Sequence, residues 1–226
     1  MLTGQDGRMR MPVGAFLVEH PDGVVVFDTG MHPELMTTKD RLRLTAGLFD
    51  VELDDRGTLA GQLAARDVAP ADVDIAVLSH LHFDHGGGLG QLPAARLLVQ
   101  QAEWDAAFED GAVELGVYNP DDFDLGHDRQ LLDGAHDLFG DGSVQVVPTP
   151  GHTVGHQSLL LEGRLLLVGD ACYTQHALDT DVVPPFGYDT AQQRVTYCWL
   201  RDQQQSGTAL VYSHDAAQWA THGDTI

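Results

Sequence analysis

LSHLHFDHGGG, residues 78–88, gathers metal-binding side chains more densely than any other stretch of this sequence. Four such side chains fall within six positions: His80, His82, Asp84 and His85. On a helix, residues that share a face are three or four apart, so positions 80 and 82 would point apart. In an extended chain these two histidines lie on one face, and the apolar run VDIAVL before them is typical of a buried strand. We therefore predict a strand over residues 73–80 that leads into a metal-binding turn.

Three further apolar runs also end on a residue that can bind a metal. VQVVPTPGH ends at His152, RLLLVGD ends at Asp170, and TALVYSH ends at His214. Buried strands are rigid, and side chains at their ends can converge at one edge of a sheet. We therefore expect these three residues to complete the site that residues 80–85 begin.

The number of candidate ligands favours two metal ions. A single zinc takes about three protein ligands and a water, whereas the sequence offers seven candidates. His80 and His82 can serve one ion and the adjacent Asp-His pair the other, at the separation of about 3.5–4 Å that two-metal hydrolases use. Imidazoles and carboxylates without a thiolate suit zinc, and also manganese, cobalt or iron. Cys172, two positions past Asp170, is expected to face away as a small buried residue.

Composition argues against several classes of function. The chain has 226 residues, and we predict a single domain over residues 1–226. It carries 12 Lys and Arg against 34 Asp and Glu, and the resulting net charge of -22 argues against a nucleic-acid partner. The start of the sequence lacks the apolar core of a secretion signal, and no apolar run approaches the roughly 18 residues of a membrane span. We therefore expect a soluble, cytoplasmic protein without a membrane partner.

The rest of the pattern is typical of layered α/β structure, because short apolar runs alternate with longer mixed segments. Residues 156–170 are expected to form a hairpin. Residues 190–205 have helical spacing, with Thr190 and Gln193 as a capping box at the start. Residues 109–142 are rich in Asp and Gly and are expected to be mostly loop.

HLHFDH, residues 80–85, resembles the HxHxDH signature of the metallo-β-lactamase superfamily. The later His, Asp and His of that superfamily have counterparts in His152, Asp170 and His214, in the same order. The resemblance runs from about residue 12 to the C-terminus. It implies an α/β fold of the αββα sandwich type, with a pair of metals held at one edge.

Within the superfamily the chain is most similar to the N-acyl-homoserine lactonases. SHLHFDHGGG, PTPGHTVGHQS and GDACYT all resemble motifs of that group. Tyr173 stands three residues past Asp170, where those lactonases place a tyrosine that contacts the substrate carbonyl. Family members carry another strand and loop ahead of the segment MPVGAFLVEH, near which this chain begins. Either the start is trimmed and this first N-terminal strand is lacking, or another element, such as the partner subunit of a homodimer, covers the exposed sheet edge.

The resemblance implies hydrolytic opening of a lactone, a small-molecule substrate. A hydroxide shared by the two metals would attack the carbonyl carbon, because metal binding lowers the pKa of water to about 7. Tyr173 would donate a hydrogen bond to the oxyanion, Asp170 would bridge the metals, and Asp84 would pass a proton to the leaving alkoxide. The metal that polarises the carbonyl would have three histidine ligands: His80, His82 and His152. The metal that stabilises the leaving oxygen would have Asp84, His85 and His214.

Other reactions of the same two-metal site are alternatives. Thioester hydrolysis of the hydroxyacylglutathione type is one, although that family prefers three consecutive histidines before its aspartate and uses basic residues, which are scarce here. Hydrolysis of phosphotriesters or of other lactones is another. From a different class comes a non-catalytic module that binds a signal molecule in a metal-dependent way. The full ligand set and Tyr173 favour turnover, although a merely packed tyrosine would look the same in the sequence.

Three local features have two interpretations each. Asp28 opens a DTG, as in aspartic proteases, but that chemistry needs two such aspartates and only one DTG occurs. Asp28 is therefore expected to brace the metal site or to start a turn. His156 either orients a ligand or begins a strand. Gly86, Gly87 and Gly88 either allow a helix N-terminus to approach closely or form a flexible turn.

Overall fold

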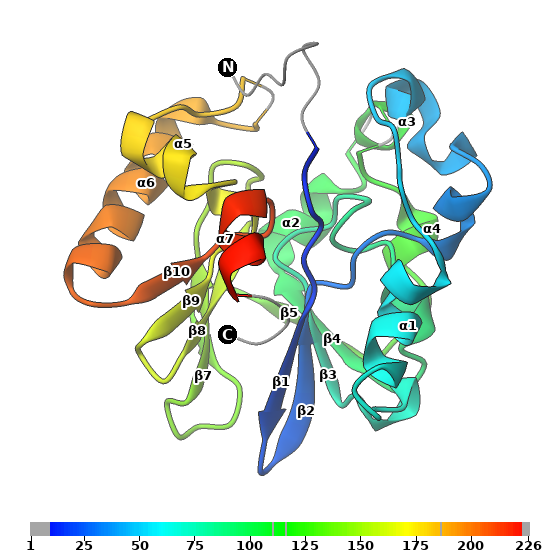
Figure 1. Cartoon of the computed structure of the whole chain (residues 1–226), viewed down its shortest axis with the longest axis horizontal. Coiled ribbons are helices and arrows are strands. Elements are labelled where there is room, and N and C mark those ends of the chain that lie inside the picture. The colour runs from blue at the N-terminus through cyan, green and yellow to red at the C-terminus, as the bar shows by residue number, and fades with distance from the viewer. Residues whose placement is uncertain (1–9, 110, 116, 186, 223–226) are drawn as a thin grey trace. The chain divides into compact units, whose positions relative to one another are not determined.

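A computed structural model describes residues 10–109, 111–115, 117–185 and 187–222. The chain forms two compact units. One unit holds residues 15–134, and the other holds residues 135–226 together with the segment that ends at Gly14. Each unit contains one five-stranded sheet, and Figure 1 shows helices beside both sheets. The layered α/β class is confirmed, whereas the single domain over residues 1–226 stays a prediction.

The unit of residues 15–134 is built on a sheet with the strand order β1-β2-β3-β4-β5. β1 and β2 form an antiparallel hairpin, and β3, β4 and β5 continue the sheet in parallel. Every residue of β3 is buried, which agrees with the apolar run that predicted this strand. The strands are β1 (Phe16–His20), β2 (Gly23–Phe27), β3 (Ile75–Val77), β4 (Arg96–Gln100) and β5 (Arg129–Leu132).

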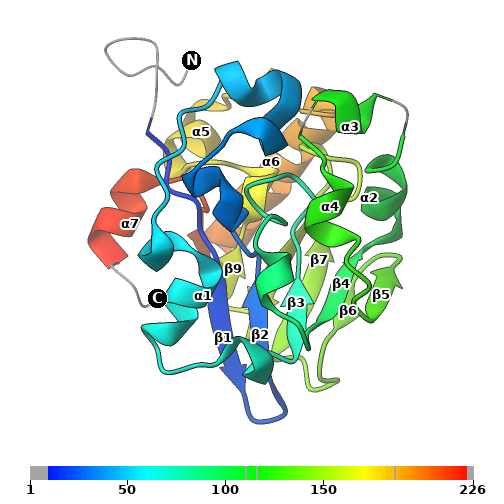
Figure 2. The same cartoon turned by 90° about the vertical axis from the view of Figure 1, so that its right-hand side faces the viewer.

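Short helices cover one face of this sheet. Leu63 of α1, Trp104 of α2 and Phe123 of α4 are buried in one apolar cluster with Ala76 of β3 and Leu97 of β4. Figure 2 shows α1 and α4 lying in front of the strands. The α-helices are α1 (Leu59–Ala64), α2 (Gln101–Ala106), α3 (Ala112–Leu115) and α4 (Pro120–Phe123). The 3-10 helices are Pro33–Met36, Asp40–Gly47, Asp55–Gly57, Pro70–Asp72 and Leu89–Gln91.

The other unit has a sheet with the order β10-β9-β8-β7-β6. β10 runs parallel to β9, and the remaining neighbours are antiparallel. Leu178 of α5, Tyr197 and Leu200 of α6, Leu166 of β9 and Leu210 of β10 are buried together in its core. The strands are β6 (His136–Asp137), β7 (Val144–Pro148), β8 (Gln157–Leu161), β9 (Leu165–Leu167) and β10 (Ala209–Val211). The helices are a 3-10 turn (Gly169–Ala171), α5 (Gln175–Thr180), α6 (Thr190–Gln205) and α7 (Ala216–His222).

Two predicted elements of this unit are confirmed, and one cap is wrong. The hairpin of residues 156–170 forms as β8 and β9, and its turn residues Glu162 and Gly163 both have positive φ. Helix α6 spans the predicted range, but Asp189 is its N-cap and accepts hydrogen bonds from two backbone amides of the first turn. Thr190 therefore lies inside the helix, and the capping box was placed one residue too late.

The prediction that residues 109–142 are mostly loop is confirmed, although it missed several short elements. This region contains the strands β5 and β6 and two short helices. Both strands lie at the edge of their sheets, and neither has the continuous apolar run that marks a buried strand. Within the described ranges, no helix combines the length and apolar character needed to cross a membrane. The lack of a first N-terminal strand stays a prediction, because residues 1–9 lie outside the described part of the chain.

Candidate metal centre

The four predicted ligands of residues 80–85 lie together in a loop that follows β3. The ring centroid of His80 lies 4.4 Å from that of His82 and 4.2 Å from that of His85. Nε2 of His85 lies 3.8 Å from an Asp84 carboxylate oxygen. The strand itself ends at Val77 rather than at His80, so a turn and not a strand edge gathers these side chains. This segment therefore presents its nitrogen and oxygen donors within a small volume.

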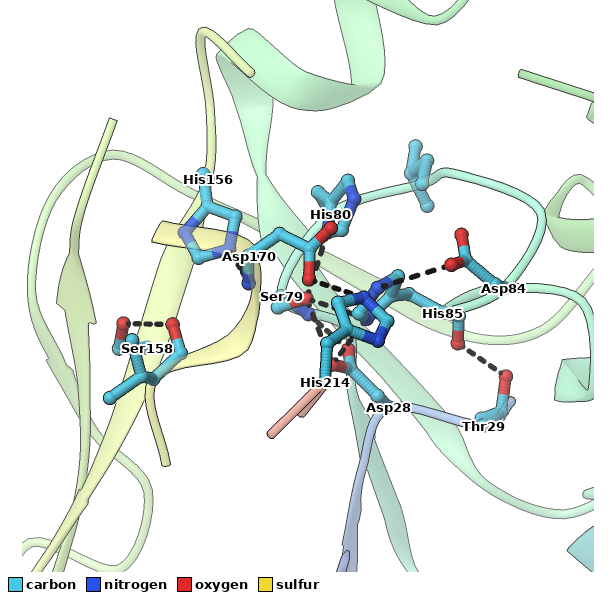
Figure 3. A network of polar contacts seen from close by, with 12 residues as sticks. Asp28, Thr29, Ser79, His80, Asp84, His85, His156, Ser158, Asp170 and His214 are labelled. Carbon is cyan, nitrogen blue, oxygen red and sulfur yellow. Dashed lines mark hydrogen bonds and ion pairs between the residues drawn. The ribbon is translucent and has the colours of Figure 1, made fainter. Parts of the chain in front are cut away.

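A buried aspartate orients this cluster from the end of β2. Asp28 accepts hydrogen bonds from the Ser79 amide (2.7 Å) and hydroxyl (2.9 Å), and its Oδ2 lies 2.8 Å from His85 Nδ1. Figure 3 shows these contacts, and both Asp28 and His85 are fully buried. Because a carboxylate accepts, His85 carries a proton on Nδ1, and its Nε2 faces Asp84. Asp28 therefore holds Ser79 and His85 in place, and the bracing of a metal site stays a prediction.

Two of the three glycines after the cluster are required by close packing. A Cβ on Gly87 would lie 2.4 Å from the Phe83 carbonyl oxygen, and one on Gly88 would lie 2.1 Å from that of Thr29. A Cβ on Gly86 would meet nothing closer than 3.6 Å. The approaching element is the backbone after β2, because Thr29 N also donates to the His85 carbonyl at 2.7 Å. Close packing therefore accounts for Gly87 and Gly88.

A second buried acid, which no sequence motif marks, supports the cluster. One carboxylate oxygen of Glu103, on α2, accepts hydrogen bonds from the Leu81 amide and from the Tyr118 hydroxyl, both at 3.0 Å. Tyr118 in turn packs its ring 4.9 Å from that of His82. Glu103 is fully buried. It holds the backbone between His80 and His82 through the Leu81 amide. Glu103 lies in a helix of mixed polar and apolar residues, where no sequence motif marks it.

In the other unit, the three remaining predicted ligands come together at the ends of three strands. One carboxylate oxygen of Asp170 lies 2.9 Å from His214 Nε2, and the other lies 3.4 Å from His152 Nε2. His214 Nδ1 lies 2.7 Å from the Pro12 carbonyl oxygen, so Nδ1 carries the proton and Nε2 faces the carboxylate. Asp170 therefore places one carboxylate oxygen beside each of the two histidines.

Tyr173 lies beside both candidate histidine ligands of this unit. Its ring centroid is 5.7 Å from that of His152 and 5.1 Å from that of His214, and its side chain is buried. Its neighbour Cys172 points the other way, into the core with α5 and α6. Burial raises the pKa of the Cys172 thiol to about 12, which makes it a poor ligand. The prediction that Cys172 faces away is confirmed.

His156 orients Asp170 through a chain of buried hydrogen bonds. The Asp170 amide donates to His156 Nε2 at 2.9 Å, so this ring must carry its proton on Nδ1, 2.9 Å from the Thr149 hydroxyl. Ser158 Oγ lies 2.8 Å from the same hydroxyl and donates to the Val168 carbonyl at 2.9 Å. The chain therefore ties the backbone on both sides of Gly169, and His156 is an orienting residue rather than a ligand.

Comparison with known proteins agrees with this arrangement. The sequence family model of the metallo-β-lactamase superfamily matches residues 9–214. The N-acyl homoserine lactonase AttM of Rhizobium johnstonii is 35% identical over 98% of this chain and 88% of its own length. Its namesake from Agrobacterium fabrum is 36% identical, over 97% of this chain and 88% of its own.

The solved structures lead to the same family. An N-acyl homoserine lactone hydrolase with the product N-hexanoyl-L-homoserine bound at its catalytic metal centre superimposes with a TM-score of 0.78. The two are 26% identical, and the match covers 94% of this chain and 85% of that one. The fold that the resemblance implied is confirmed. The chain belongs to the metallo-β-lactamase superfamily, where its relatives include N-acyl homoserine lactonases.

Proposed function

We propose that this protein is a metal-dependent hydrolase that opens the ring of N-acyl-homoserine lactones, and thus a quorum-quenching lactonase. The observation that carries this proposal is the group of Asp170, His152, His214 and Tyr173, in which a tyrosine stands beside a carboxylate shared by two histidines. Such a group suits a carbonyl substrate, because the tyrosine can donate to its oxygen. Relatives with more than 30% identity over nearly the whole chain carry the name lactonase.

We further propose that the predicted ligands bind two divalent ions. Two facts support this: the donors are imidazoles and carboxylates, and in both His85 and His214 an acceptor at Nδ1 directs Nε2 towards a carboxylate oxygen. Zinc is the leading candidate, with manganese, cobalt or iron(II) as alternatives. The ions would supply a hydroxide nucleophile at neutral pH and stabilise developing negative charge. The proposed ligands are His80, His82, Asp84, His85, His152, Asp170 and His214.

The chain's own residues would then divide the work of ring opening. Tyr173 would hold the lactone carbonyl and donate a hydrogen bond that strengthens as the oxygen becomes an anion. Asp84 is partly exposed, with 18% of its side chain accessible, and would take up the proton of the attacking nucleophile and pass it to the leaving alkoxide of the ring. His156 and Asp28 would keep Asp170 and His85 in the orientation and tautomer that this chemistry needs.

Several finer points stay predictions. Thioester and phosphotriester hydrolysis use the same type of site, and a metal-dependent sensor would bind the lactone without opening it. The cytoplasmic location and a homodimer also stay predictions from the sequence.

One experiment tests the proposed function directly. The purified protein is analysed for metal, and acid release from lactones of several acyl-chain lengths is followed in a pH-stat before and after chelation. We expect about two ions per chain, turnover that chelation abolishes, and recovery on adding metal. His214→Ala should lose turnover and metal together, whereas His176→Ala, at an exposed position of α5, should keep both. Binding of intact lactone without ring opening would instead support the sensor.

A further inference from the structure

We infer that Asp215 is a positioning residue that holds Tyr173 in place against His214. This inference rests on the proposed function, because it gives Tyr173 a role in turnover. Asp215 follows the candidate ligand directly in the chain, and only 7% of it is exposed. A buried carboxylate is costly unless hydrogen bonds satisfy it, so its partners show what it does.

Both carboxylate oxygens of Asp215 accept hydrogen bonds from backbone amides. Oδ1 accepts from Ala217 N (3.0 Å) and Gln218 N (3.1 Å), in the first turn of α7. Oδ2 accepts from Gln175 N at 2.9 Å, in the first turn of α5. One side chain therefore joins the segment that carries His214 to the helix that begins just after Tyr173.

A second contact links the same two segments. The Tyr212 hydroxyl, from the strand end before His214, donates to the side-chain oxygen of Gln175 at 3.1 Å. On the other side of Tyr173, the Gln193 side chain donates to the carbonyl oxygens of Asp170 (3.3 Å) and Ala171 (3.1 Å). Tyr173 thus lies between two anchored points, and Asp215 provides the anchor that faces His214.

An amide cannot replace this carboxylate. Asn has one acceptor oxygen, so Asp215→Asn can keep either the bond to Gln175 N or the cap of α7, but not both. A displacement of about 1 Å of a group that contacts the reacting atoms can cost as much as 100-fold in rate. The loss should fall on kcat rather than KM, because the tyrosine contact strengthens in the transition state.

The test is a double-mutant cycle between Asp215 and Tyr173 on the metal-loaded protein. We expect Asp215→Asn to lower kcat about 10-fold to 100-fold and Tyr173→Phe to lower it about 100-fold or more. If Asp215 acts through Tyr173, the double variant is no slower than Tyr173→Phe alone. Asp179→Asn is the matched control, because this exposed carboxylate of α5 accepts a hydrogen bond from the side chain of Gln175 and not from its backbone N–H. The inference would be overturned if the two losses in kcat multiply in the double variant, or if Asp215→Asn has the kcat of the wild type.

A second pair of variants leaves Asp215 intact. Gln175 is the first residue of α5, where proline is well tolerated, and Thr174 before it has the extended backbone that a proline requires. Gln175→Pro removes the amide donor, whereas Gln175→Ala removes only the side chain. Gln175→Pro should therefore be about 10-fold or more slower than Gln175→Ala, and adding Asp215→Asn to it should change nothing further. Equal rates for the two Gln175 variants would contradict the inference.

A spectroscopic measurement separates this inference from the proposed function. The chain has five tyrosines, so 3-fluorotyrosine labelling gives five fluorine signals, and Tyr173→Phe assigns one of them. We expect Asp215→Asn and Gln175→Pro to shift the Tyr173 signal, and Asp179→Asn to leave it unchanged. A wild-type protein that opens no lactone but shows these shifts would refute the function alone. A Tyr173 signal that does not respond would refute the positioning role.

Discussion

Replacing Asp28 by Asn should weaken metal binding while leaving the fold almost untouched. Asp28 has a φ of 58°, a left-handed conformation that Asn adopts about as readily as Asp, and the two side chains have the same shape. The change therefore removes a charge and an acceptor without straining the backbone. In the wild-type protein the carboxylate receives two hydrogen bonds from Ser79 and faces the protonated Nδ1 of His85.

The magnitude follows from these contacts. If the Asn oxygen keeps the bond to the Ser79 amide, its NH2 group faces His85 Nδ1 and favours the tautomer with the proton on Nε2. That tautomer cannot bind a metal through Nε2. Loss of such an orienting partner typically costs 10-fold to 100-fold in metal affinity, which corresponds to about 1.4–2.8 kcal/mol. This range also agrees with the roughly 1.5–3 kcal/mol of one hydrogen bond to a charged group.

The assay is a competition titration of zinc against a chromophoric chelator, with the apo forms of each variant. Asp22→Asn is the matched control, because this exposed carboxylate lies in the turn of the same hairpin that carries Asp28. We expect the control to bind zinc like the wild type and Asp28→Asn to bind at least one ion more weakly. Equal dissociation constants for all three proteins would refute the argument that Asp28 sets the His85 tautomer.

Three further predictions concern packing, pH and salt. Gly88→Ala should lower the free energy of unfolding by about 1–3 kcal/mol or more, because its Cβ would lie 2.1 Å from a backbone oxygen. Gly86→Ala is the control: its Cβ would meet nothing closer than 3.6 Å, so thermal denaturation should show the stability of the wild type. Burial raises the pKa of Asp122 from 3.8 to about 6 despite its ion pair with Arg41, so the folded state holds this proton more tightly than the unfolded state. The free energy of unfolding of the wild type should therefore fall by roughly 3 kcal/mol relative to that of Asp122→Asn as pH rises from about 4 to about 6. Urea unfolding measures both free energies, and the same pH dependence in the two proteins would contradict this prediction. Finally, the acidic side chains behind the net charge of -22 repel one another, and salt screens this repulsion. The midpoint of thermal unfolding should therefore rise between 10 mM and 1 M NaCl, by about 2–4 °C for each kcal/mol of repulsion that is screened. A midpoint that stays constant or falls would exclude repulsion as a limit on stability.

The sequence predicted much of the fold because buried strands leave a strong signal. β3, β4 and β8 carry apolar runs that favour a covered strand, and the turn between β8 and β9 has Gly163 at one of its two positions with positive φ. β5 and β6 were missed because an edge strand needs no continuous apolar run. The cap of α6 was misplaced because Asp189 and Thr190 are both good N-cap residues, and only the path of the chain decides between them.

The candidate ligands stand out in the sequence for a related reason: a metal needs particular side chains, and the sequence contains them close together or at the ends of apolar runs. The proton on each imidazole is a different matter, because the acceptor opposite the ring decides which nitrogen faces the metal. For His214 that acceptor is the backbone oxygen of Pro12, which any residue at that position would provide. For His85 it is Asp28, 57 positions away in the chain. The sequence therefore shows which groups can bind a metal, but the folded chain decides which of them are held in the form that does.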